Sequence, residues 1–134
     1  MTRRSFAFVW GAVAALALSA PVLAHHSFSA EFDADKPVTV KGVITAVRLE
    51  NPHSWFFLDV TGADGKVEKW SFEASTPSSL IRSGFKPGTV KAGDEVTIKG
   101  YHARDASANA AAGRELVMTD GRAFAIGPQV GPVR

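Results

Sequence analysis

The sequence predicts an all-β fold with one short helix, arranged as a small five-stranded barrel of the OB-fold type. Short runs of alternating apolar residues are separated by turn signals such as Asn51-Pro52 and Asp64-Gly65, which is typical of antiparallel strands. A single helical segment falls between the third and fourth runs, and this order of elements is that of an OB-fold. Another small antiparallel barrel or a sandwich is the alternative architecture.

The first strand is predicted at residues 38–49. Val38 and Val40 share one face of this strand. Beyond Gly42 the apolar residues continue on the opposite face, as Val43, Val47 and Leu49. A glycine at the point where the apolar phase reverses predicts a β-bulge there, and a bend at this bulge would help to close the barrel.

The second strand (residues 53–60) and the third (residues 67–73) are expected to form a hairpin around Asp64-Gly65. The alternating side chains that should face the core are Phe56, Leu58, Val60, Trp70 and Phe72. The opposite face of the second strand then carries His53, Trp55, Phe57 and Asp59.

A short helix is predicted after the third strand. Thr76 is its expected N-cap, Pro77 takes the first helical position, and Gly84 supplies the C-terminal stop. Leu80 and Ile81 are expected to face inward.

Further strands are predicted at residues 94–101 and 115–119, followed by a turn at Asp120-Gly121 and a final segment at residues 122–126. Val90 is a candidate start for one more short strand. Residues 103–113 are polar and alanine-rich without an apolar period, which predicts a flexible loop.

The first 24 residues have the pattern of an export signal: a short basic start, an apolar run and the tripeptide Val22-Leu23-Ala24. Cleavage is expected after Ala24, and an uncleaved membrane anchor is the alternative. Arg3 and Arg4, with Phe6 close behind, also fit a twin-arginine signal. The mature protein is therefore expected in the periplasm or outside the cell, with no stable membrane insertion. It would comprise an N-terminal arm (residues 25–37), a barrel domain (residues 38–126) and a tail (residues 127–134).

The charge of the predicted mature chain is balanced. Arg3 and Arg4 are the only charged residues of the signal, and removing them from the 15 basic residues leaves 13, against 13 acidic ones. A neutral, exported domain is a poor match for nucleic acid, which attracts a basic face. The chain has no cysteine, so disulfides, thiolate metal sites and a catalytic thiol are excluded.

Three segments of the chain resemble a family of small exported bacterial proteins of unknown function. They are AHHSFSAEFD at the mature start, VKGVITAVRLENPHSWFFLDV, and the hairpin that follows as far as Trp70. The resemblance implies export and a small β-rich domain. It brings no established activity, and therefore no site residues.

The histidines are the candidate metal ligands, and without thiols they favour copper or zinc. Cleavage after Ala24 would make His25 the N-terminus, where its α-amine and its ring nitrogen can chelate one ion together. With His26 nearby and His53 as a further nitrogen donor, this ligand set resembles the histidine brace of copper-dependent polysaccharide oxygenases and of some periplasmic copper carriers. Cleavage one residue earlier would instead place His26 third, a spacing that amino-terminal copper and nickel sites use.

The histidines could instead have purely structural roles. His25 and His26 can form a polar, exposed chain start, His53 can cap the turn at Asn51-Pro52, and His102 can point either way at its strand end.

Trp55 and Phe57, beside His53 on the non-core face, are candidate ligand-binding residues. Exposed rings at this place in an OB-fold can stack on a sugar, a base or a peptide. Alternatively the arm covers them through Phe28 and Phe32.

These observations predict an exported, non-enzymatic binding module for a small ligand or an envelope protein, with copper as its candidate cofactor. The alternatives are a copper-dependent redox enzyme and an envelope assembly protein without metal. Catalysis by side chains alone is not indicated, because the sequence has no nucleophile elbow, HExxH motif or P-loop.

Overall fold

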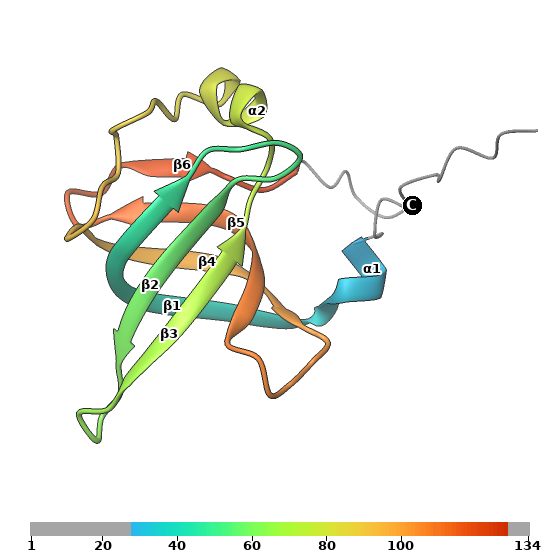
Figure 1. Cartoon of the computed structure of the whole chain (residues 1–134), viewed down its shortest axis with the longest axis vertical. Coiled ribbons are helices and arrows are strands. Elements are labelled where there is room, and N and C mark those ends of the chain that lie inside the picture. The colour runs from blue at the N-terminus through green and yellow to red at the C-terminus, as the bar shows by residue number, and fades with distance from the viewer. Residues whose placement is uncertain (1–27, 129–134) are drawn as a thin grey trace, which may run out of the picture.

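A computed structural model describes residues 28–128 of the chain (Figure 1). In sequence order the elements are α1 (Phe28–Glu31), β1 (Phe32–Arg48), β2 (Trp55–Thr61), β3 (Val67–Glu73), α2 (Pro77–Arg82), β4 (Glu95–Ala103), β5 (Ala110–Met118) and β6 (Ala123–Ala125). The strands form one sheet in the order β3-β2-β1-β4-β5-β6. Neither described helix is long and apolar enough to cross a bilayer.

The sheet closes on itself because β3 also pairs in parallel with β5, from Ser71 opposite Ala110 to Glu73 opposite Ala112. The other neighbouring pairs are antiparallel. The first five strands therefore form a ring, and the short β6 lies on β5 beyond the point where β3 leaves it. The prediction of a mostly β fold with a helix between the third and fourth strands is confirmed.

The core fills the inside of this ring. Phe56 and Phe72 are fully buried and lie directly opposite each other across the β2–β3 pair. The Phe85 ring meets Phe56 edge-on at 5.5 Å between centroids and Phe124 at 5.6 Å, so the loop after α2 joins the core to β6. The alternation predicted for β2 and β3 is confirmed at Phe56, Leu58 and Phe72, while Val60 and Trp70 pack partly buried against the same cluster.

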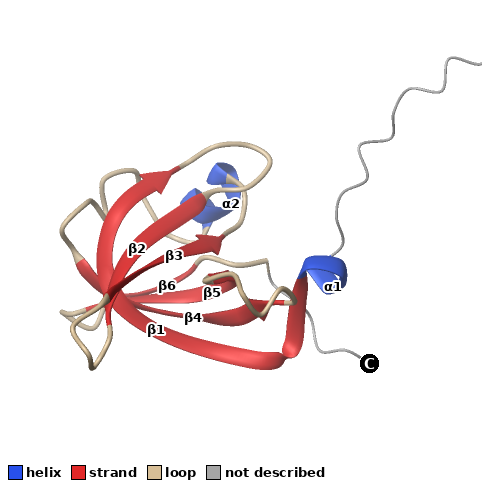
Figure 2. Cartoon of the chain, turned by 60° about the horizontal axis from the view of Figure 1, so that its bottom comes forward, coloured by secondary structure: helices blue, strands red, loops and turns tan. Residues whose placement is uncertain are grey.

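The first strand starts earlier than predicted. It begins at Phe32, whose ring is buried. Phe32 pairs with Ala103 of β4, and the register then shifts between Phe32 and Pro37. Residues 33–37 were expected to belong to the N-terminal arm, but they are part of the strand, which bends sharply near α1 in Figure 2. The side chains of residues 33–37 are largely exposed, so the sequence shows no apolar alternation there that would have predicted a strand.

The predicted bulge at Gly42 is wrong, because Gly42 pairs in regular register with Val96 of β4. The register shift lies between Ile44 and Ala46, opposite β2. Ile44 is 1% exposed and takes the core position, whereas Val43 is 40% exposed. Glycine is required at position 42 for another reason: a Cβ there would lie 2.7 Å from the Asp59 carbonyl oxygen.

The helix is capped as predicted. The Thr76 hydroxyl accepts a hydrogen bond from the Ser79 amide at 3.3 Å, and Gly84 adopts a positive φ of 94° just beyond the helix. Leu80 is buried, but Ile81 is 53% exposed, so the inward orientation predicted for Ile81 is wrong. A helix of under two turns has a narrow face, and only Leu80 reaches the core. Val90 is buried in the following loop and starts no strand.

The flexible loop predicted at residues 103–113 is wrong over its second half. Residues 110–113 are the start of β5, paired with β4 on one side and, at Ala110–Ala112, with β3 on the other. Small residues are needed here because the backbones approach closely: a Cβ on Gly100 would lie 2.0 Å from the Ala112 carbonyl oxygen. Tertiary packing therefore overrides the low strand propensity of alanine.

Candidate functional site

His53 is held by a carboxylate at the open end of the β2–β3 hairpin. Pairing continues past the strands, since the Ser54 amide donates to the Ser75 carbonyl at 3.1 Å and the Ala74 amide to the Ser54 carbonyl at 2.8 Å. Nδ1 of His53 contacts the Glu73 carboxylate, and the side chains of the two residues are 44% and 15% exposed. An ionised carboxylate only accepts, so Nδ1 carries the proton. In the neutral ring the lone pair on Nε2 is then available.

A cavity of about 490 Å³ opens beside this pair. It lies between α1, the end of β3, the start of α2, β5 and Pro128. Its wall combines the rings of Phe28 and Phe32 with Ala112, and it carries the polar groups of Glu31, His53 and Glu73. The cavity brings together the beginning of the described arm and the end of the hairpin, which are far apart in the sequence.

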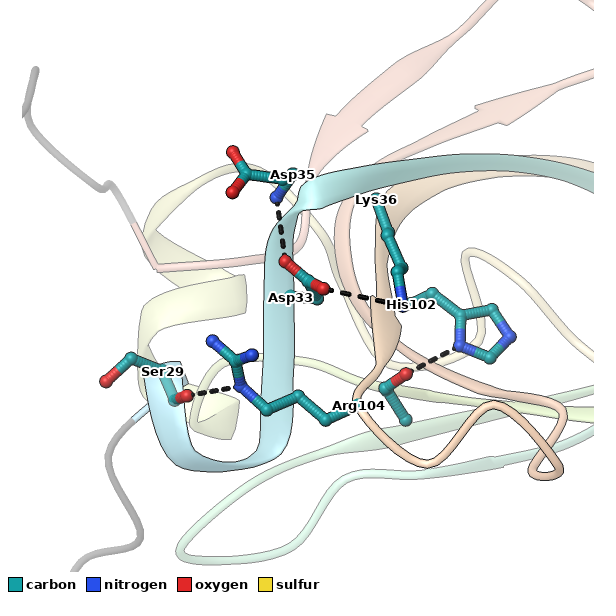
Figure 3. Close-up of polar contacts among 7 residues, drawn as sticks. Ser29, Asp33, Asp35, Lys36, His102 and Arg104 are labelled. Atoms are coloured by element: carbon teal, nitrogen blue, oxygen red, sulfur yellow. Dashed lines mark hydrogen bonds and ion pairs between the residues drawn. The ribbon is translucent and has the colours of Figure 1, made fainter.

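The arm is fastened to the end of β4. The Arg104 Nε donates to the Ser29 carbonyl at 2.6 Å (Figure 3), and the Arg104 amide donates to the Glu31 carbonyl at 2.8 Å. The Phe28 ring lies 5.6 Å from Phe32 and 5.9 Å from Tyr101, between centroids. These contacts place Phe28 at the cavity, as one wall of it.

Asp33 lies beside this attachment. The amide of Asp35 donates to its carboxylate at 3.1 Å, and the Lys36 ammonium lies 3.6 Å from it (Figure 3). The backbone hydrogen bond from Asp35 lowers the pKa of Asp33 most; desolvation opposes this effect, and the charges of Arg104 and Lys36 lower the pKa further. The ionised form is thus favoured in the fold, and this contribution is present above the unfolded-state pKa and is lost as the pH falls through the folded-state pKa.

Replacing Arg104 by alanine is expected to loosen α1. Losing the side-chain hydrogen bond to Ser29 should cost about 1 kcal/mol of local stability, so amides at residues 29–33 should exchange roughly fivefold faster by hydrogen–deuterium exchange. Arg122→Ala is the control, because Arg122 pairs with Asp120 in a distant turn. Unchanged exchange in the arm of Arg104→Ala would mean that the ring contacts and the backbone hydrogen bond to Glu31 hold it without the Arg104 side chain.

His102 does not share the cavity with His53 and makes contacts of its own. Its Nδ1 lies 2.7 Å from the Ala103 carbonyl oxygen (Figure 3), so Nδ1 carries the proton. Its ring meets Trp70 edge-on at 5.7 Å between centroids. It is not among the residues that line the cavity beside His53.

Trp55 and Phe57 lie side by side on the outer face of β2. Their ring centroids are 6.4 Å apart with an interplanar angle of 20°, and the Arg48 guanidinium lies 5.3 Å from the Phe57 ring centre. Both rings stay partly exposed. The ring contacts of Phe28 are with Phe32 and Tyr101, and not with Trp55 or Phe57, which the alternative of a covering arm would require.

Of the predicted metal ligands, only His53 lies among the described residues. His25 and His26 lie outside the described residues, and so does the predicted signal with its cleavage site. Within residues 28–128, no three His, Asp or Glu side chains are grouped to hold a metal ion.

Three residues of the site were missed by sequence reasoning: Glu31, Glu73 and Arg104. Glu73 had a usable signal, because a two-stranded hairpin around Asp64-Gly65 with regular register places it opposite Trp55. Glu31 and Arg104 had none, because their positions depend on how the arm packs against the end of β4.

Fold and site together define a small β domain whose sheet closes into a ring and whose N-terminal arm forms one wall of a cavity. The chain belongs to the DUF6152 family, a family of unknown function that matches residues 12–112. The predicted resemblance to a family of unknown function is confirmed at that level. Comparison with curated proteins found no significant match.

Proposed function

We propose that the protein is an exported binding module that holds copper through His25, His26 and His53 at the cavity beside α1. The observation that carries this proposal is the contact between the His53 imidazole and the Glu73 carboxylate. Histidines that ligate metals commonly donate their second ring N–H to such a carboxylate, which orients the ring and raises its basicity. Copper(II) suits nitrogen ligands of this kind.

Chain geometry supports the participation of the N-terminal histidines. Phe28 lines the same cavity as His53. Only two residues, His26 and Ser27, lie between His25 and Phe28, so the Cα atoms of His25 and Phe28 are at most about 11 Å apart. After cleavage at Ala24, the α-amine and the ring of His25 would therefore start within reach of the cavity and of His53.

A second candidate is the binding of an envelope protein without metal. The paired rings of Trp55 and Phe57 favour it, because partly exposed aromatic residues beside an arginine are typical of binding hot spots. A copper-dependent redox enzyme would use the same histidines, and it would show oxygen- or peroxide-dependent turnover once loaded with copper.

The test begins with the intact mass of protein exported by the cell, which gives the mature N-terminus. Copper(II) is then titrated into the purified protein. One ion per chain is expected, and His53→Ala should weaken its binding at least tenfold, roughly the lower bound for even an outer-shell partner. His102→Ala is the matched control and should leave copper affinity unchanged.

Glu73→Gln tests whether Glu73 orients the His53 ring for copper binding, because this substitution leaves the imidazole itself in place. The amide cannot fix the ring as the carboxylate does, so copper affinity should fall by about 10- to 100-fold. A mature chain that begins beyond His25 would eliminate the N-terminal chelate. Tight copper binding that survives His53→Ala would remove His53 from the site, and the absence of copper binding would favour the partner-binding candidate.

A further inference from the structure

We propose that a second pocket, between α2 and the end of β6, binds a phosphate group, either as the free ion or as the monoester of a small alcohol. This site goes beyond the proposed function and does not depend on copper. Its wall includes Arg82 and three serines, Ser75, Ser79 and Ser83. The volume of about 320 Å³ is at the lower end of the range of ordinary ligand pockets, about 300–1,000 Å³, so the occupant is small.

The charge of this pocket favours an anion. None of the described residues that line it is Asp, Glu or His, and Arg82 carries the one formal charge among them. The Arg82 guanidinium donates to the Ser79 hydroxyl at 2.9 Å and makes no ion pair within residues 28–128. Lys41 and Lys99, by contrast, each pair with a glutamate across the sheet. The charge of Arg82 is therefore left for a ligand.

The polar groups of the wall are arranged to donate hydrogen bonds. The Ser79 hydroxyl accepts from Arg82, which leaves its own proton free to donate. Ser75 uses its backbone on the Ile126 carbonyl and the Ser54 amide, whereas no described residue bonds its hydroxyl. The planar fork of an arginine matches phosphate oxygens. Donors from separate segments suit a tetrahedral phosphate, whose oxygens point in several directions, better than a planar carboxylate.

The wall of the pocket is held in place without a ligand. The Ser83 hydroxyl bridges the carbonyls of Leu80, at 2.8 Å, and Ala125, at 2.9 Å, and so ties α2 to the end of β6 (Figure 1). On the opposite side, the Gly127 amide donates to the Arg114 carbonyl at 3.3 Å. A small ligand that enters a wall fixed in this way loses little affinity to ordering of the protein.

Inorganic phosphate and glycerol 3-phosphate are the probes, and glycerol and acetate are their controls. Each is titrated into the metal-free exported protein at about pH 8, where the phosphate group carries nearly two charges, with chloride holding the ionic strength constant. Amide chemical shifts should saturate with both phosphate probes and centre on Ser75, Ser79 and Arg82. Phosphate should bind roughly tenfold more tightly than acetate, and glycerol should not bind. Shifts centred elsewhere, or equal binding of acetate, would overturn the proposal.

Variants test the role of Arg82. Arg82→Gln should weaken the binding of both phosphate probes roughly tenfold, and Arg82→Lys should weaken it less, because it keeps the charge and loses the fork. Lys86→Gln is the matched control: it removes the same charge outside the pocket and should change affinity less than about twofold. Circular dichroism and thermal unfolding confirm that each variant is folded. Phosphate binding that survives Arg82→Gln, or that falls equally in Lys86→Gln, would contradict the assignment.

The two phosphate probes also identify the source of the group. Tighter binding of glycerol 3-phosphate would point to a monoester and tighter binding of phosphate to the free ion, and either ranking supports the site. Pro128 lines the pocket and residues 129–134 follow it. Phosphate binding that appears only after these residues are removed would overturn the proposal, because the end of the chain itself would then be the occupant.

Arg82 also separates this proposal from the copper site. The two pockets share Ser75, Ser79 and Pro128, but Arg82 lines only the second. Arg82→Gln should therefore leave copper affinity unchanged while phosphate binding falls. Loss of copper affinity in this variant would contradict the assignment of Arg82 to a separate site. A protein that binds phosphate without copper keeps this proposal and rejects the metal, and the reverse result does the opposite.

Discussion

Replacing Gly100 by alanine is expected to lower the free energy of unfolding by about 4 kcal/mol or more, at the upper end for single substitutions. An added Cβ would lie 2.0 Å from the Ala112 carbonyl oxygen and 2.9 Å from its carbon. Both are backbone atoms of β5, at the place where β5 pairs with β3 and closes the ring. The strands would have to separate, because neither side can rotate away.

Denaturant unfolding measures this effect, and Gly62→Ala is the matched control. A Cβ on Gly62 would meet the Asp64 carboxylate at 3.0 Å, at the end of a flexible side chain in the exposed β2–β3 turn. The control should change the unfolding free energy by less than about 1 kcal/mol. A mild effect of Gly100→Ala would show that β4 and β5 lie further apart than the structure has them. Since Ala112 also lines the cavity, the same substitution should impair ligand binding.

Truncating Phe56 to alanine is expected to cost about 3–5 kcal/mol, the usual range for a buried aromatic residue. Phe56 is fully buried, lies opposite Phe72 across the hairpin, and meets the Phe85 ring edge-on. Removing its ring leaves a void among β2, β3 and the loop after α2, which the surrounding backbone cannot fill.

Phe57→Ala, one residue along the same strand, is the control for this truncation. The Phe57 ring lies on the outer face with Trp55 and Arg48 and stays partly exposed. Its loss should cost less than about 2 kcal/mol by chemical denaturation. Equal costs at positions 56 and 57 would mean that the assignment of the inner and outer faces of β2 is wrong.

Local patterns carried the predictions that succeeded. The alternation of Phe56 and Leu58 and the cap at Thr76 depend on residues within a few positions of each other, and the structure confirms them. The glycine at position 42 shows the limit of this reasoning. The sequence predicted a bulge there, which is wrong; the role of Gly42 is to admit the Asp59 carbonyl of β2, which depends on a neighbouring strand.

The candidate site was predictable to a smaller extent. His53 was identified from its place beside the turn, but its partner Glu73 depends on the register of the β2–β3 pair. The cavity could not be foreseen at all, because its wall comes from α1, β3, α2, β5 and Pro128, which only folding brings together.

By itself the sequence determined the mostly β character, the order of strands and helix, and which residues of the hairpin face the core. These properties follow from side-chain periodicity, turn chemistry and helix caps, all of which act over a few residues. Only the tertiary structure decided where β1 begins, that the alanine-rich segment closes the ring, and that the arm forms a wall of the cavity beside His53. Those features depend on how closely distant backbones can approach, and no local pattern encodes that distance.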